Sequence, residues 1–297
     1  MKDVRYEFFT GTYGVGAFYG VAVNDKVINL STTIGTFYDK SIDTLSEFII
    51  YSEHYNLEKL IEHGDVVKDL KNLTVLPPIP VPFRNPICVG KNYMGHLNEI
   101  KGIDKETNIP EVPIYFTKLT NRVTGHNKDL VVDKKFADEL DYEGELVIVI
   151  GKEGKNIKRE DAHKYIFGLS CGNDFSHRRL QRDHRQWLMG KSLDGFTAMG
   201  PFIVKDESID YKNLKISTRV NGEYRQKSNT KDMIFGVDYL IENLSSMVTL
   251  KPGDIIFTGT PQGVGAGFTP NKFLKDGDVV DVEIAGIGVL RNKVVVR

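Results

Sequence analysis

The chain has 297 residues, of which 40% are hydrophobic and 27% are charged. This is the composition of an ordinary globular protein and excludes a disordered or fibrous chain. Its 39 basic and 40 acidic residues leave a net charge of -1, so no global field attracts polyanions, and neither nucleic acid nor an anionic membrane is expected as a partner. A small molecule is the expected ligand.

Cysteine usage and the N-terminus indicate a cytoplasmic protein. Cys88 and Cys171 both lie in apolar stretches, and two cysteines form neither a disulfide framework nor a four-cysteine zinc site. The uncharged stretch 8–24 is interrupted by four glycines, whereas a membrane helix needs roughly 20 predominantly apolar residues. We therefore expect neither a signal peptide nor a transmembrane span.

Two local patterns define the first part of the chain. The runs 19–23 and 26–30 flank a turn and predict a β-hairpin. Thr44 and Glu47 have the spacing of a capping box, so a helix is expected to begin there, and the helical region ends at Gly64. These patterns predict a small mixed domain.

A proline-rich stretch then divides the chain. Five of the eleven prolines fall within residues 77–86, where neither a central strand nor a helix interior can form. We therefore predict an N-terminal domain over residues 1–76, a linker over 77–86 and a larger domain over 87–297.

Short β-rich runs dominate the chain after the linker, and turn signals such as Asn221-Gly222 separate them. Only the stretch from Asp232 to Leu244 has a clear helical pattern. Because strands and helices do not alternate regularly, a doubly wound parallel sheet is not expected. We predict an α+β fold that is mainly β, with a large and mostly antiparallel β body. The predicted strands span 146–150, 165–173, 215–220, 254–258, 279–284 and 293–296.

The segment from Asp141 to Ile150 joins acidic residues to a hydrophobic run. Alternation along a strand places Glu143 and Glu145 on one face, while Gly144 between them leaves room for close backbone approach. Two neighbouring carboxylates beside a buried run repel each other, and a cation between them would compensate their negative charges. The alternative is an exposed strand end with two solvated acids.

Asp174 adds a third carboxylate at the end of a second predicted strand. Three carboxylates without a companion cysteine favour a hard cation in an oxygen site, Mg²⁺ or Mn²⁺ rather than Zn²⁺. The seven histidines contain no His-Glu-x-x-His pattern, so none of them is predicted as a metal ligand.

His96 and Glu99 lie three residues apart, shortly after the strand-like run 87–89. On a helical turn the carboxylate would orient the imidazole as a general base. A plain surface ion pair is the alternative. The polar stretch 101–113 that follows is interpreted as a lid over a site.

From Phe257 to Gly267 a strand runs into a glycine-rich loop, whose backbone N–H groups and threonine hydroxyls suit a carboxylate or a phosphate. No Gly-Lys-Ser/Thr closes the loop, so it is not a P-loop. A local basic cluster does not change the expectation against nucleic acid, because the chain as a whole is neutral. This cluster consists of Arg178, Arg179, Arg182 and Arg185.

Together these segments resemble the fumarylacetoacetate hydrolase superfamily, from about Ile87 to the C-terminus. No single motif is decisive, but a shared order over so long a stretch is not a chance match. The matching segments are Gly90-Lys91-Asn92-Tyr93 through His96 and Glu99, Phe116-Thr117-Lys118, 141–146, 173–178, Gly190-Lys191-Ser192, Gly200-Pro201, 220–223, Pro252-Gly253-Asp254 and 258–265.

The resemblance implies a catalytic domain with a mixed β-sandwich roll, a small N-terminal α+β domain and a homodimer. It also implies that Mg²⁺ or Mn²⁺ is bound by Glu143, Glu145 and Asp174. The other implied site residues are Lys191 and the lid dyad His96 and Glu99 in catalysis, and Lys118, Arg178, Thr258, Gly259 and Thr260 in substrate binding. The chain departs from the family pattern at Arg179, where many relatives carry an acid, and at Gln262, where a small residue is common.

The chemistry that the resemblance implies is cleavage or rearrangement beside a 2-oxo acid, where a metal stabilises the enolate left when the C3–C4 bond breaks. Segments 123–126 and 268–270 look most like bacterial members with oxaloacetate decarboxylase activity, so decarboxylation to pyruvate is predicted first. Hydrolysis of an acylpyruvate or fumarylacetoacetate-type substrate, with water activated by His96, is one alternative. Isomerisation or dehydration of a related 2-oxo acid is another, and a regulatory binding protein with a vestigial site is the alternative that is not an enzyme.

Overall fold

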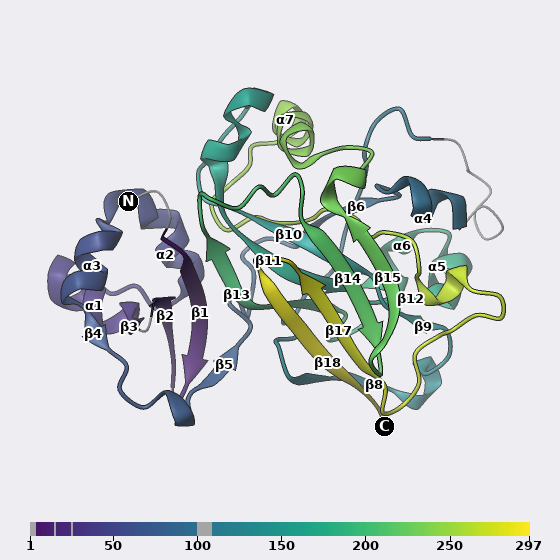
Figure 1. Ribbon diagram of the computed structural model, residues 1–297, viewed down its shortest axis with the longest axis horizontal. Coiled ribbons are helices and arrows are strands. Elements are labelled where there is room, and N and C mark those ends of the chain that lie inside the picture. Colours follow the sequence, from purple (N-terminus) through teal and green to yellow (C-terminus); the bar gives the residue numbers. More distant parts are fainter. Residues whose placement is uncertain (1–3, 15, 25, 100–108) are drawn as a thin grey trace.

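The computed structural model describes residues 4–14, 16–24, 26–99 and 109–297, and two large β-sheets dominate it (Figure 1). The larger sheet has 11 strands and joins the N-terminal strands to those that follow the proline-rich stretch, because β1 pairs antiparallel with β13. In order across the sheet, its strands are β4 (Asp65–Val66), β3 (Lys26–Asn29), β2 (Ala17–Val23), β1 (Tyr6–Thr12), β13 (Thr197–Lys205), β11 (Ile166–Asp174), β10 (Gly144–Ile150), β16 (Ile255–Phe257), β6 (Ile87–Gly90) and β7 (Ile114–Thr117), with β5 (Thr74–Leu76) paired to β1.

The second sheet has five strands and packs against the first. Its strands, in order, are β15 (Glu223–Asn229), β14 (Lys215–Val220), β17 (Val279–Ile284), β18 (Gly288–Val296) and β8 (Lys128–Val132). A two-stranded sheet of β9 (Leu140–Asp141) and β12 (Ser176–His177) lies next to the ends of β10 and β11. Most strand pairs are antiparallel, as predicted, whereas β16 with β6 and β18 with β8 are parallel.

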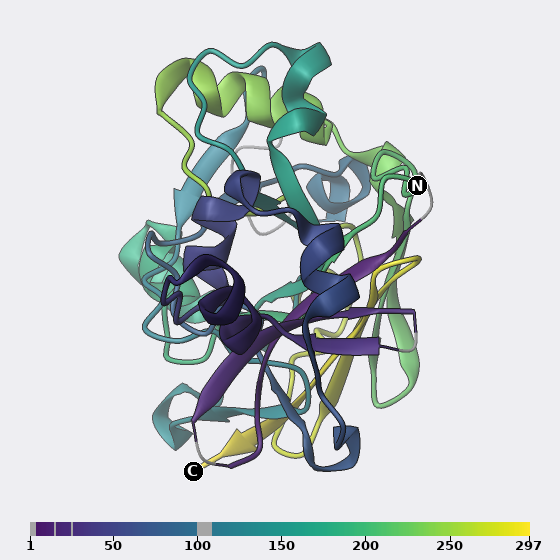
Figure 2. The ribbon, with the colours of Figure 1, turned by 90° about the vertical axis from the view of Figure 1, so that its left-hand side faces the viewer.

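Short helices surround the sheets. Figure 2 shows α1 (Leu30–Tyr38), α2 (Leu45–Tyr51) and α3 (Leu57–His63) gathered over the N-terminal strands. The capping box predicted for Thr44 and Glu47 is confirmed at the start of α2. The remaining helices are α4 (Met94–Glu99), α5 (Arg178–His184), α6 (Trp187–Lys191) and α7 (Val237–Met247). None of the helices in the described part of the chain has the length and apolar character that a membrane crossing requires.

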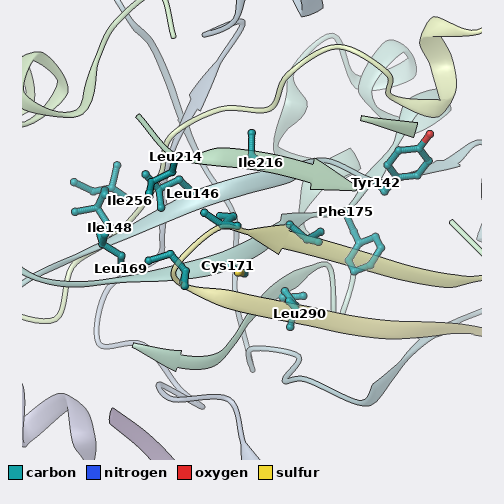
Figure 3. Close-up of a cluster of buried hydrophobic side chains, with 14 of the residues drawn as sticks. Tyr142, Leu146, Ile148, Leu169, Cys171, Phe175, Leu214, Ile216, Ile256 and Leu290 are labelled. Carbon is teal, nitrogen blue, oxygen red and sulfur yellow. The ribbon is translucent and has the colours of Figure 1, made fainter. Parts of the chain in front are cut away.

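A hydrophobic core holds the two sheets together (Figure 3). Leu146 and Ile148 of β10 and Cys171 of β11 pack with Ile216 of β14 and Leu290 of β18, and each of these side chains is at most 1% exposed. Burying a large aliphatic side chain stabilises the fold by about 1.5–3 kcal/mol. Because this packing fixes β10 and β11, it also fixes the acidic residues at the ends of these two strands.

Gly144 lies at the start of β10, next to residues of the second sheet. A Cβ atom there would lie 2.2 Å from Thr218 Oγ1, so this glycine leaves room for the side chain of Thr218 against the backbone of β10. The hydrophobic run that follows is buried throughout, and its β-branched residues favour a strand covered on both faces.

The α+β, mainly β fold class is confirmed. The helix predicted from Asp232 is wrong at its start, because α7 begins at Val237 after the cap residue Gly236 and a short 3₁₀ turn occupies Thr230–Asp232. Three further helices follow the linker, α4, α5 and α6, and each is too short to show a clear periodic pattern in the sequence. The predicted lid over 101–113 falls largely on residues 100–108, which lie outside the described residues.

Candidate active site

Three carboxylates meet where β10 and β11 come together. Glu143 immediately precedes β10, Glu145 lies within it and Asp174 is the last residue of β11. Each offers one oxygen atom within 4.8 Å of the others, because antiparallel pairing sets Gly144 opposite Asn173. Since the three residues are 6%, 1% and 0% exposed, the alternative of two solvated acids at an exposed strand end is wrong.

Three cationic side chains surround these acids. Lys191 Nζ donates to Glu143 Oε2 at 2.6 Å and to Asp174 Oδ2 at 2.7 Å. Lys118, which is fully buried, forms an ion pair with Asp174 Oδ1. Arg178 Nη2 lies 2.7 Å from Glu143 Oε1. The residues predicted separately as metal ligands and as substrate contacts therefore form one connected cluster.

The acids differ in their electrostatic surroundings. Burial opposes ionisation of Glu143, but the charges of Lys191 and Arg178 outweigh it and lower the pKa of this carboxyl. Burial, reinforced by the charges of Asp174 and Glu143, raises the pKa of Glu145 well above its ordinary value. In the described part of the chain Glu145 has no cationic partner and instead accepts the Gly259 N–H at 2.7 Å.

Asp141 links this cluster to the glycine-rich loop, a role that the sequence analysis did not assign. Its carboxylate accepts Arg178 Nε at 2.8 Å and the backbone N–H groups of Gly265 at 2.6 Å and Ala266 at 3.0 Å. The sequence feature that could have indicated this role is the position of Asp141 two residues before Glu143 in the same acidic segment. Asp141 thereby orients the arginine that contacts the acid cluster.

The donor set fits a divalent cation. Four acids, the three at the strand ends and Asp141, face three bases, Lys118, Lys191 and Arg178, so the formal charge of the cluster is -1. A buried uncompensated charge is costly, and a divalent ion would turn it to +1, which favours an anionic substrate. Clustered carboxylate oxygens are the ligands that Mg²⁺ and Mn²⁺ prefer.

The predicted dyad forms on α4. His96 Nδ1–H donates to Glu99 Oε1 at 2.8 Å, and the two side chains are only 8% and 15% exposed, so the alternative of a plain surface ion pair is wrong. Glu99 Oε2 accepts the Gly263 N–H at 2.8 Å. A Cβ atom at Gly267 would lie 2.4 Å from Glu99 Oε2, so this glycine of the loop leaves the space that Glu99 occupies.

The remaining predicted loop residues tie the loop to β10. Thr258 donates its hydroxyl proton to Leu146 O at 2.8 Å, and Thr260 donates to Gly144 O at 3.0 Å. Gly259 has a φ of 98°, a backbone conformation that favours glycine. Of the residues 258–260, Thr260 is the one that lines the cavity described next.

A cavity of about 240 Å³ connects the dyad to the acid cluster. Five of the predicted site residues line it: His96, Glu143, Arg178, Lys191 and Thr260. Its wall also contains Phe116, Gln181, Arg182, Arg185 and Trp187, to which the sequence analysis gave no role in the site. Positions 178, 181, 182 and 185 have the spacing of one helix face, and this signal would have grouped them had α5 been predicted.

One cavity is thus lined by a member of a buried acid cluster and by the histidine of a histidine–carboxylate pair, an arrangement that defines an enzyme active site. Residues 85–295 match the family described as fumarylacetoacetate (FAA) hydrolase, C-terminal, and the chain belongs to this family. It is an enzyme of the fumarylacetoacetate hydrolase superfamily, as predicted.

Three similar proteins illustrate the extent of the relationship. The chain is 47% identical over 234 residues to oxaloacetate tautomerase YisK of Bacillus subtilis, covering 78% of this chain and 77% of that protein. It is 38% identical over 295 residues to the fumarylacetoacetate hydrolase domain-containing protein 2 homolog of Dictyostelium discoideum, covering 93% and 92%. The solved structure of a fumarylacetoacetate hydrolase from Exiguobacterium antarcticum has a TM-score of 0.84 and 36% identity, covering 98% of this chain and 100% of the other.

Proposed function

We propose that this enzyme catalyses the keto–enol tautomerisation of oxaloacetate or a closely similar 2-oxo diacid, with a bound Mg²⁺ or Mn²⁺. The observation that carries the proposal is that one cavity is lined both by His96, which is hydrogen-bonded to Glu99, and by Glu143 of the acid cluster. A proton carrier and a cation site within one cavity suit proton transfer beside a 2-oxo group. The name of the Bacillus subtilis relative supports oxaloacetate as the substrate.

In this proposal Glu143, Glu145 and Asp174 hold the metal, which supplies Lewis-acid stabilisation of the enolate charge when bound. Arg178, Lys191 and Thr260 line the cavity and bind the carboxylate next to the 2-oxo group. Lys118, Thr258 and Gly259 were predicted as substrate contacts. Because all three pack behind the acids, against Asp174, β10 and Glu145, we propose that they position the metal ligands.

His96 moves the proton. Because its Nδ1–H donates to Glu99, its Nε2 is the ring atom left to exchange a proton with substrate. In the keto-to-enol direction Nε2 accepts the proton from C3, the C–H electron pair becomes the C2–C3 double bond, and the 2-oxo oxygen takes the charge. The imidazolium then returns its proton to this oxygen, which restores neutral His96. Glu99 stabilises the imidazolium that forms, and Gly263 holds Glu99 in place.

Decarboxylation of oxaloacetate, the reaction that the sequence predicts first, is the second candidate. The observation that favours it is the apolar part of the cavity wall, formed by Val89, Phe116 and Trp187. A carboxylate that loses hydration against such a wall is destabilised relative to carbon dioxide. Both reactions place an enolate charge on the 2-oxo oxygen. Tautomerisation gives the enolate of oxaloacetate with C4 attached, whereas loss of carbon dioxide gives the enolate of pyruvate.

The two candidates separate in one assay. Enol oxaloacetate is mixed with protein and Mg²⁺, the decay of the enol absorbance is followed, and pyruvate is measured in the same sample, with the rates of metal alone subtracted. The proposal predicts enol decay faster than pyruvate release, and loss of this acceleration in His96→Gln. Equal rates of enol decay and pyruvate release would favour the decarboxylase, and no acceleration of either would refute both.

A further inference from the structure

Arginines on the cavity wall are of two kinds. Arg178 and Arg182 lie one turn apart on α5, and both are neutralised by carboxylates of the protein. Arg178 pairs with Asp141 and with Glu143, and Arg182 binds Glu139 with two hydrogen bonds of 2.7 and 2.8 Å. The charges of these two side chains are therefore already compensated within the fold.

Arg185 is different. It lines the same cavity, is exposed to solvent, and its guanidinium has no hydrogen-bond or ion-pair partner among the residues that the structure describes. It ends α5 in the left-handed region, with φ 57° and ψ -5°. Glycine and asparagine suit such a position better than a residue with a long side chain. Backbone geometry therefore does not account for an arginine here.

The charge of the substrate supplies a partner. A 2-oxo diacid has one carboxylate next to the 2-oxo group and a second at its far end, and a 2-oxo monoacid lacks the second. If the 2-oxo acid end occupies the acid cluster, where a bound divalent cation would leave a formal charge of +1, the far carboxylate needs a cation of its own. A guanidinium binds a carboxylate through two parallel N–H donors.

We propose that Arg185 binds the carboxylate at the far end of the substrate and thereby selects 2-oxo diacids over monoacids. The inference rests on the proposed function, which sets the 2-oxo acid end at the acid cluster. A far carboxylate held by Arg185 is retained on the substrate, which agrees with tautomerisation.

Malate and lactate test this selection without turnover, because both are 2-hydroxy acids that differ by the far carboxylate alone. Their dissociation constants are measured by titration calorimetry with the Mg²⁺-loaded wild type and with Arg185→Gly, whose glycine suits the left-handed backbone. We expect the preference of the wild type for malate to fall about ten- to a hundredfold in the variant, the loss of a charge-assisted contact, with lactate affinity unchanged. Arg185→Gln should lose the preference to the same extent.

Arg179→Ala is the matched control. Arg179 also lies on α5 and is exposed, but it binds Asp138 through two hydrogen bonds and does not line the cavity. This variant should keep the wild-type preference. The inference is overturned if Arg185→Gly keeps the preference, if Arg179→Ala loses it equally, or if the wild type binds the two acids equally or binds neither.

The carboxylate site at Arg185 and the proposed reaction can be refuted separately. A wild type that selects malate through Arg185 but does not convert oxaloacetate would refute the proposed reaction and leave the carboxylate site standing. A wild type that converts oxaloacetate, with malate selection unaffected in Arg185→Gly, would refute the carboxylate site alone.

Discussion

Glu145→Gln should make the metal-free protein more stable and abolish its stabilisation by Mg²⁺. The wild-type carboxylate is 1% exposed and lies beside two other acids. A glutamine of the same shape removes this charge, and its side-chain oxygen can still accept the Gly259 N–H. Without metal, the cost of this buried charge grows by about 1.4 kcal/mol for each pH unit between 4.5 and the raised pKa, so removing the charge is expected to stabilise the fold.

The stability that Glu145→Gln gains over the metal-free wild type should increase with pH. The pKa of Glu145 is raised well above its ordinary value of 4.5, so the folded state binds this proton more tightly than the unfolded state does. The metal-free wild type therefore loses stability as the pH rises above about 4.5 toward the raised pKa. Glu145→Gln lacks this loss, so its advantage should be small near pH 4.5 and should grow with pH.

Chemical denaturation in EDTA and in Mg²⁺ measures both effects. At 100 times the dissociation constant, Mg²⁺ should stabilise the wild type by about 2.7 kcal/mol and the variant by almost nothing. Glu153→Gln is the control, because Glu153 is 59% exposed and pairs with an exposed lysine, so it should change stability by less than about 1 kcal/mol in either condition. The reasoning fails if Glu145→Gln is destabilised in EDTA, or if Mg²⁺ stabilises it as much as the wild type.

Two further substitutions test how the site residues are held in place. Lys118→Met should lower the free energy of unfolding, measured by urea denaturation without metal, by at least about 2 kcal/mol, because it removes a buried partner of Asp174. A decrease below about 1 kcal/mol would contradict the role of this pair. In Gly267→Ala the added methyl displaces Glu99, so steady-state kinetics should show kcat lowered about tenfold or more with KM little changed. An unchanged kcat would show that Glu99 does not act through His96.

The acid cluster was predictable because it depends on short-range pattern. Alternation places Glu143 and Glu145 together, and the run that ends at Asp174 has the length of one strand. The local pattern does not show the antiparallel register that sets Gly144 opposite Asn173, because that register depends on the packing of the whole sheet. The family resemblance, and not the pattern, therefore placed Asp174 with the two glutamates.

Helix α5 was not predictable from pattern. It has seven residues, none of them buried, so no apolar periodicity marks it. Its contacts with the rest of the fold include partly exposed ion pairs, from Arg179 to Asp138 and from Arg182 to Glu139, whose acids lie about forty positions earlier in the chain. The cavity wall that it forms was therefore missed.

The relation between the N-terminal strands and the rest of the fold also depends on distant residues. β1 lies near the start of the chain and pairs with β13, which lies about two thirds of the way along it. One sheet therefore contains strands from before and after the proline-rich stretch. Local propensity cannot show such a pairing. The division into a domain over 1–76 and a domain over 87–297 stays a prediction, which separate expression of the second part would test.

The most direct test of the account is hydrogen exchange at C3 of oxaloacetate. Proton NMR in D₂O, with Mg²⁺, follows loss of the C3 hydrogens with and without protein. We predict that the wild type and Arg179→Ala accelerate the exchange over metal alone, and that His96→Gln and Glu145→Gln do not. Two results would contradict a site in which this dyad transfers a proton beside the acid cluster. One is that the wild type exchanges no faster than metal alone, and the other is that His96→Gln exchanges as fast as the wild type.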